Sequence, residues 1–108
     1  MFKQEAEVID IFFPQDDLRI GTNLYEQAYV KMKMGNLDKA EEIMNLSLEH
    51  AKMSSDDMCI GCAYRGLGEI MNAYEDCEQA RAYFEKAIEA FGFTGDTIAV
   101  EEVKAMLK

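Results

Sequence analysis

The stretch from Tyr64 to Ala87 constrains the fold most, because large and small apolar residues alternate along it at helical spacing. A small residue such as Gly68 lets two helix backbones approach closely, and a large one such as Phe84 fills the space between them. The apolar positions are Tyr64, Leu67, Gly68, Met71, Ala80, Phe84 and Ala87. The stretch therefore predicts two helices that pack against each other and are joined by a turn at residues 74–76.

The composition favours a single helical domain. A length of 108 residues fits one domain, since domains commonly contain about 100–150 residues. Apolar residues make up 49% of the chain, which is enough for a core, and a single proline with seven glycines argues against a loop-rich or all-β chain. The many Met, Ala, Glu, Leu and Lys residues favour helix. We therefore expect an all-α fold.

The residues of the central stretch resemble the tetratricopeptide repeat family, in which units of two antiparallel helices stack into a superhelix. The resemblance is carried by Tyr64, the Leu67-Gly68 pair, Met71, Ala80, Phe84 and Ala87. The proline that usually closes the unit is absent, so the second helix is expected to continue through Phe91. The resemblance implies an α-α superhelix of stacked antiparallel hairpins, with an extended repeat unit.

A second, similar unit precedes this stretch. Gly35 suits the left-handed conformation that ends a helix, and Asn36 is a suitable N-cap for a helix from Leu37 to about Met53. Ala40, Met44 and Ser47 stand where Ala80, Phe84 and Ala87 stand in the later unit. The units are 40 residues apart, against about 34 for the standard repeat. The extra residues predict longer helices around the junction at residues 53–57.

These units divide the chain into four parts, namely an N-terminal segment at 1–14, a first repeat at 18–53, a second repeat at 55–91 and a C-terminal capping helix at 96–108. Ser54, followed three residues later by Asp57, resembles a capping box that opens the second repeat. In the first repeat, Gln27 and Lys31 occupy sites where the family usually has large apolar residues. An end repeat without a full neighbour tolerates polar residues there; the alternative is a different register for that helix.

The N-terminal segment ends in a dense apolar group before Pro14, which stops regular helix. The group is Val8, Ile9, Ile11, Phe12 and Phe13. A helix is one interpretation, and the β-branched and aromatic residues suit a short strand equally well. Because repeat proteins generally need about three repeats to bury a continuous core, we expect the chain to form homo-oligomers through this group.

Charge and hydropathy exclude several kinds of partner. The net charge of −10 disfavours nucleic acid, and no basic run exceeds the loose cluster at Lys31 and Lys33. No apolar run approaches the roughly 20 residues that a membrane span needs, and acidic residues interrupt the first 13 residues, unlike a signal peptide. Three cysteines, an odd number, fit free thiols in a reducing compartment. We expect a cytoplasmic protein.

Cys59 and Cys62 are the residues that most suggest chemistry, because thiols three residues apart on a helix project from one face. Cys77 and His50 could complete a zinc site, but each stands alone on a different helix, and Cys77 occupies a position that is usually buried and apolar in the family. A metal- or redox-responsive regulator using Cys59, Cys62 and Cys77 is therefore the alternative function. No cofactor is expected.

No catalytic set is visible elsewhere. Gly66-Leu67-Gly68 lacks the third glycine and the preceding strand of a phosphate-binding loop. The acidic pairs fall near helix starts or on outer faces, as caps and solvated residues do. We therefore expect the protein not to be an enzyme. The pattern gives no reason for Gly61 and Gly66, each of which costs about 1 kcal/mol of helix stability relative to Ala.

The resemblance implies that the first helix of each repeat lines a concave groove that binds an extended peptide or a partner helix. By position, the groove residues are Tyr25, Tyr29, Met32 and Lys33 from the first repeat, and Arg65, Glu69 and Asn72 from the second. An equally weighted alternative packs Tyr25, Tyr29 and Met32 against an N-terminal helix. The family's Lys and Asn clamp for a chaperone C-terminus is not reproduced. The sequence therefore predicts a non-enzymatic protein–protein interaction module, a scaffold or adaptor.

Overall fold

The computed structural model describes residues 16–107, and within them five α-helices follow one another without a strand. They are α2 (Asp16–Lys33), α3 (Leu37–Ser54), α4 (Asp57–Ala73), α5 (Cys77–Thr94) and α6 (Thr97–Met106). The predicted all-α fold is confirmed. Val8, Ile9, Ile11, Phe12 and Phe13 lie outside the described residues, so their secondary structure and the self-association expected through them stay predictions.

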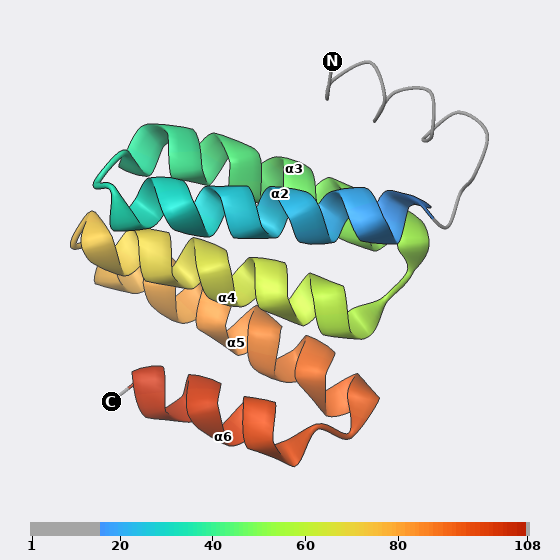
Figure 1. The fold of residues 1–108 in the computed structure, drawn as a ribbon. Coiled ribbons are helices and arrows are strands. Elements are labelled where there is room, and N and C mark those ends of the chain that lie inside the picture. Colours follow the sequence, from blue (N-terminus) through green and yellow to red (C-terminus); the bar gives the residue numbers. More distant parts are fainter. Residues whose placement is uncertain (1–15, 108) are drawn as a thin grey trace.

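The helices form two antiparallel hairpins and a final single helix. In Figure 1, α2 and α4 lie side by side in one layer, α3 and α5 lie behind them, and α6 follows below. Most interhelical contacts join α2 to α3 and α4 to α5, while α3 also packs on α4 and α6 packs on α5. The hairpins therefore stack as the sequence predicts.

All four helix junctions repeat the same local geometry every 20 residues. Gly35, Ser55, Glu75 and Gly95 have positive φ angles of 84°, 56°, 67° and 76°. The residues that follow them, Asn36, Asp56, Asp76 and Asp96, are N-caps that accept a hydrogen bond from the backbone N–H three residues later. A left-handed residue followed by a cap reverses the chain without an intervening loop. The 40-residue repeat is therefore two 20-residue units of helix and turn.

The predicted capping box at Ser54 is wrong. Ser54 is the last residue of helix α3 and not the residue that immediately precedes α4, and its hydroxyl donates to the carbonyl oxygen of Ala51 in its own helix at 2.9 Å. Asp56 caps α4 instead, accepting from the backbone N–H of Cys59 at 3.1 Å. Cys77 also differs from its predicted burial: it is the first residue of α5 and is exposed.

Helix α4 is the centre of the core, and its glycines explain how closely its neighbours approach. A Cβ atom at Gly61 would lie 2.7 Å from the Phe91 ring, and one at Gly68 would lie 2.6 Å from the Phe84 ring, both on α5. On another side of the helix, a Cβ atom at Gly66 would overlap the end of the Met44 side chain on α3. The glycines for which the helix pattern gives no reason are thus required by packing between helices.

The first repeat is more polar on its outer side, as expected for an end repeat. Gln27 is exposed and Lys31 is half-buried, while Ala28 is fully buried against the core. Gln27 and Lys31 belong to α2, the first described helix, and among the described residues no earlier repeat packs against it.

Replacing the core glycines tests this packing. We expect Gly68→Ala to lower the free energy of unfolding by about 1–3 kcal/mol, because the new methyl group meets the Phe84 ring. Gly66→Ala should cost less, since the Met44 side chain is flexible. Gly92→Ala is the control: nothing lies within 4 Å of its Cβ position, and alanine should raise helix stability by up to about 1 kcal/mol. Urea unfolding measures all three, and a Gly68→Ala variant as stable as wild type would contradict the packing argument.

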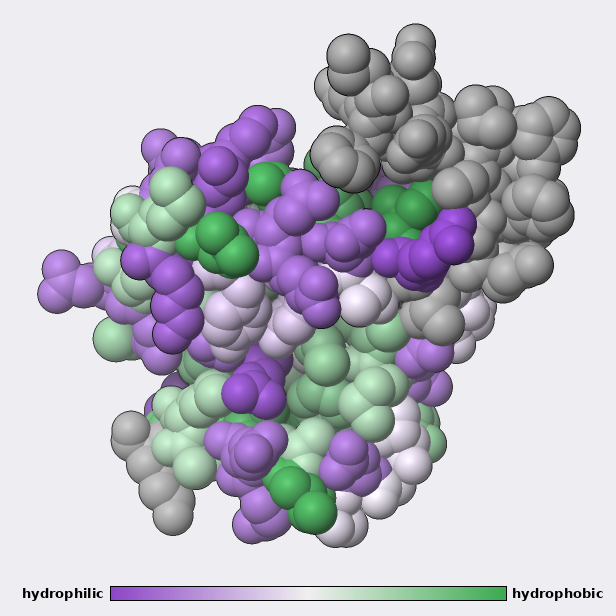
Figure 2. All heavy atoms as spheres, in the orientation of Figure 1, coloured by the Kyte–Doolittle hydropathy of each residue, from purple (hydrophilic) through white to green (hydrophobic). Residues whose placement is uncertain are grey.

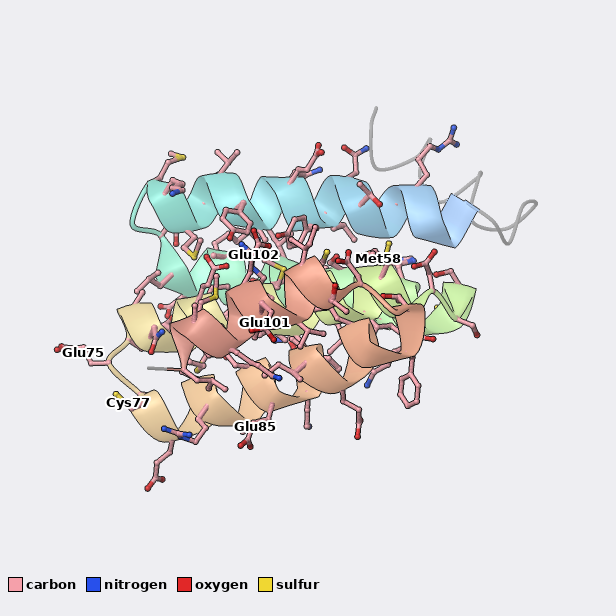
Figure 3. All side chains as sticks on the ribbon, turned by 90° about the horizontal axis from the view of Figure 1, so that it is seen from below. Met58, Glu75, Cys77, Glu85, Glu101 and Glu102 are labelled. Carbon is pink, nitrogen blue, oxygen red and sulfur yellow. The ribbon has the colours of Figure 1, made fainter. Side chains whose placement is uncertain are left out.

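The junctions allow a second test. Glu75 has a φ of 67°, a conformation that costs a residue with a Cβ atom about 1–2 kcal/mol. Glycine removes this cost but is more flexible in the unfolded chain, so Glu75→Gly should stabilise the fold by up to about 1 kcal/mol. Figure 3 shows Glu75 at the turn between α4 and α5, projecting from the molecule. Gly35→Ala should destabilise the fold, because Gly35 has a φ of 84° and alanine has a Cβ atom. Thermal unfolding that ranks the two variants in the opposite order would contradict this reasoning.

Candidate functional site

The first helices of the two hairpins, α2 and α4, form one face of the molecule together with α6. We call it the front face, and define it by Tyr25, Tyr29, Arg65, Glu69 and Glu102. Figure 2 shows this side, with strongly hydrophilic residues over α2 and paler, less polar residues over α4. The face therefore combines charged groups with apolar surface.

The structure brings four of the seven predicted groove residues together on the front face. All four are half-buried: Tyr25 packs against Tyr29, Tyr29 is hydrogen-bonded to Glu69, and Glu69 is hydrogen-bonded to Arg65. Met32 is half-buried and packs against the core cluster, as the two tyrosines also do. Lys33 and Asn72 are exposed. The alternative, in which Tyr25, Tyr29 and Met32 pack against an N-terminal helix, falls on residues outside the described ones, so both expectations stay predictions.

The two tyrosines form a rigid pair on α2. Their ring centroids are 5.3 Å apart and their planes meet at 63°, an edge-to-face arrangement. Tyrosines four residues apart lie on one side of a helix, and such aromatic pairs contribute about 0.5–1.5 kcal/mol beyond their burial. The rings are therefore held in place before any partner binds.

A polar network ties the three helices of the front face together. The Tyr29 hydroxyl donates to the carboxylate of Glu69, with its oxygen 2.5 Å and 2.6 Å from the two acceptor oxygens, and so links α2 to α4. The Nε atom of Arg65 donates to the same carboxylate at 3.3 Å. An Nη atom of Arg65 lies 3.5 Å from an oxygen of Glu102, which links α4 to α6.

Glu102 is the member of this network that the sequence prediction missed. It is 37 residues from Arg65, and no local pattern connects them. The 40-residue period could have identified Glu102. Counting back 40 residues from Glu102 gives Cys62, which lies one helical turn before Arg65 on the same side of α4. In Figure 3, Glu102 lies on the side of α6 that is nearer to α2. Applying the period to the last helix would have identified it.

The pKa values of the front-face tyrosines are raised by burial. Burial raises the pKa of Tyr25 to about 12. Burial, followed by the hydrogen bond to Glu69, raises the pKa of Tyr29 well above its ordinary value. Both phenols are therefore neutral near pH 7, so that Tyr29 is a hydrogen-bond donor to the carboxylate.

The cysteines do not form a site. Cys59 is in the first turn of α4 and Cys77 begins α5, so the length of α4 separates them, roughly 20 Å or more at 1.5 Å per residue. Among the residues that the structure describes, no group of three or more His, Cys, Asp or Glu residues could hold a metal ion. Burial also raises the pKa values of Cys59 and Cys62, which lowers the fraction of reactive thiolate. The geometry gives the alternative function no support.

Two stacked antiparallel hairpins with closely packed, glycine-rich contacts define a helical-repeat protein. The model of the tetratricopeptide repeat family matches residues 19–91, which span both hairpins. The chain therefore belongs to the tetratricopeptide repeat family. The family suggests a protein–protein interaction module. A comparison with curated proteins finds no match. None of the described helices is both long enough and apolar enough to cross a membrane.

The raised tyrosine pKa values predict a loss of stability in alkali. A folded-state pKa above the unfolded value of about 10 means that the folded state binds the phenolic proton more tightly. The contribution of these two phenols to the free energy of unfolding should therefore be constant below about pH 10 and fall as the pH rises from there through the folded-state pKa, about 12 for Tyr25. Urea unfolding at a series of pH values measures the fall.

The double variant Tyr25→Phe, Tyr29→Phe is the matched test, because it keeps both rings and removes both phenols. It should lose most of the alkaline fall. A residual fall is expected from Tyr74, whose hydrogen bond to Asp38 raises its pKa to about 12, and from the Cys59 and Cys62 thiols, whose pKa values burial raises. If the double variant and the wild type lose stability in parallel above pH 10, the front-face tyrosines are not the cause.

Proposed function

We propose that the protein is a non-enzymatic interaction module of the cytoplasm that holds a peptide or a helix of a protein partner on the front face. The observation that supports this most strongly is the arrangement of Tyr25, Tyr29, Arg65 and Glu69, which come from two helices and are fixed by contacts with one another. Tyrosine and arginine are the residue types that most often dominate binding energy at protein interfaces.

Pre-organisation favours binding at this face. The tyrosine rings already pack on each other and on the core, so a partner does not have to immobilise them. Tyr29 and Arg65 are both fixed through Glu69, whose side chain is only 22% exposed. The face therefore presents aromatic and cationic groups at low entropic cost.

Arg65 is also able to exchange one of its partners. Its ion pair with Glu102 spans 3.5 Å, and the Glu102 side chain is 57% exposed, so the pair contributes at most about 1 kcal/mol. A carboxylate or backbone carbonyl of a bound peptide can replace Glu102 at little cost, while Glu69 keeps Arg65 in position. Lys33 and Asn72, both exposed, supply further donors at the predicted site.

We further propose that residues 18–53 and 55–91 are the two repeats and that 96–108 caps them. The cap is supported by a comparison of α6 with α4, whose residues correspond at a spacing of 40. On the side of α4 that packs against α5 stand Gly61 and Tyr64. The corresponding residues of α6 are Glu101 and Lys104, whose side chains form an ion pair at 3.5 Å. A charged surface of this kind does not favour close packing of a further helix.

The front-face proposal is tested by measuring binding to a partner captured from cell extract with the full chain. Tyr29→Ala and Arg65→Ala should each weaken that binding about tenfold or more, as removal of an interface anchor does. Glu85→Ala is the control, because Glu85 is exposed on α5 and Figure 3 places it on the side away from α2. Circular dichroism verifies that each variant is folded.

A photo-reactive residue at Asn72 or at Glu85 then localises the contact. Cross-linking from position 72 and not from position 85 is expected. Undiminished capture by both alanine variants, or cross-linking from position 85 alone, would rule out the front face as the binding site.

A further inference from the structure

A second surface lies on the layer formed by α3 and α5, which Figure 1 places behind α2 and α4. Lys52 of α3, Tyr64 of α4, and Tyr83 and Lys86 of α5 converge there, and we call these four residues the back patch. The Tyr64 and Tyr83 rings stack with centroids 6.2 Å apart and an interplanar angle of 28°. The Nζ atoms of Lys52 and Lys86 lie 5.7 Å and 5.5 Å from the centroid of the Tyr64 ring.

The two ammonium groups are not neutralised by neighbouring acids. Glu49 and Glu89 stand three residues from Lys52 and Lys86 on their own helices. Yet within residues 16–107 neither lysine forms an ion pair with a carboxylate, although the chain has 21 acidic residues against 11 basic ones. The back patch is therefore a locally positive, aromatic surface on an acidic protein.

The contacts of these two lysines differ from those of Arg65, the cation of the front face. Arg65 contacts two carboxylates, those of Glu69 and Glu102. The lysines of the back patch contact an aromatic ring, which attracts a cation through its face but leaves the three N–H donors of each ammonium group able to bind an anion. Among the described residues, the back patch is therefore a place where two ammonium groups without an ion pair converge on one aromatic stack.

We propose that the back patch binds an acidic segment of a protein partner, with closely spaced carboxylates on Lys52 and Lys86 and an apolar side chain on the tyrosine stack. The proposal is independent of binding at the front face. Charge complementarity supports it locally, and the net charge of −10 does not prevent it. At physiological ionic strength the Debye length is about 8 Å, so distant acidic residues are largely screened while contact pairs are retained.

The experiment uses the full chain and a defined probe, an acetylated and amidated peptide of sequence Glu-Glu-Leu-Glu-Glu, with the corresponding Gln-Gln-Leu-Gln-Gln peptide as its neutral control. NMR follows the ring resonances of all five tyrosines at physiological salt. The acidic peptide should shift the Tyr64 and Tyr83 resonances saturably, and the neutral peptide should not.

Paired variants separate charge from position. Lys52→Gln with Lys86→Gln should weaken the peptide about tenfold or more, while Lys52→Arg with Lys86→Arg, which keeps charge and ring contact, should retain it. The double variant K39Q/K104Q removes the same charge from two exposed lysines elsewhere and should bind within about twofold of wild type. Circular dichroism verifies that each variant is folded.

Three outcomes would overturn the proposal: K52Q/K86Q binding as tightly as wild type, the neutral peptide producing the same shifts, or the absence of shifts at Tyr64 and Tyr83. Shifts confined to Tyr25 and Tyr29 would also overturn it, but would support the front face. Conversely, loss of partner capture in K52Q/K86Q with none in the front-face variants would support the back patch and contradict the proposed function.

Discussion

The close approach of α4 to its neighbours is the constraint on which the structure depends. Rings from α5 occupy the space above Gly61 and Gly68, and a methionine from α3 occupies the space above Gly66. Glycine is unfavourable inside a helix, so α4 is a weak helix in isolation and is stabilised by what packs into its glycine sites. The hairpin and the stack are therefore coupled, because the same helix supplies the contacts for both.

The uniform junctions explain why the front face is assembled from residues far apart in the sequence. Each reversal uses one left-handed residue and one cap, and four reversals of equal spacing bring every second helix back to the same layer. Residues 40 positions apart consequently occupy equivalent places. This is how Tyr29 comes to meet Glu69, at a separation of 40 residues, and why two hairpins and one further helix are sufficient to build a continuous polar network.

The sequence predicts the features that are encoded in one helix or one turn, and it fails where two distant elements must meet. The spacing of Leu67, Phe84 and Ala87 identifies the hairpin, and the Gly35-Asn36 turn is confirmed. Asp56 was missed as a cap because Ser54 offered an equally suitable oxygen, and only the structure shows that hydroxyl bonded to Ala51. Gly61 and Glu102 were missed because their partners are on other helices.

The two faces have different electrostatic states although they share α4. On the front face Arg65, the positive group of the network, is matched by carboxylates of the protein itself, so the binding proposed there requires a partner group to replace Glu102 at Arg65. On the back patch the lysines contact an aromatic ring and form no ion pair within residues 16–107, so the binding proposed there adds contacts without breaking an ion pair of the described residues. Exchange contributes mainly selectivity, since a poor replacement leaves Arg65 less well paired, whereas addition contributes affinity that depends strongly on salt. Under the two proposals, one small domain provides two surfaces that distinguish partners by different physical criteria.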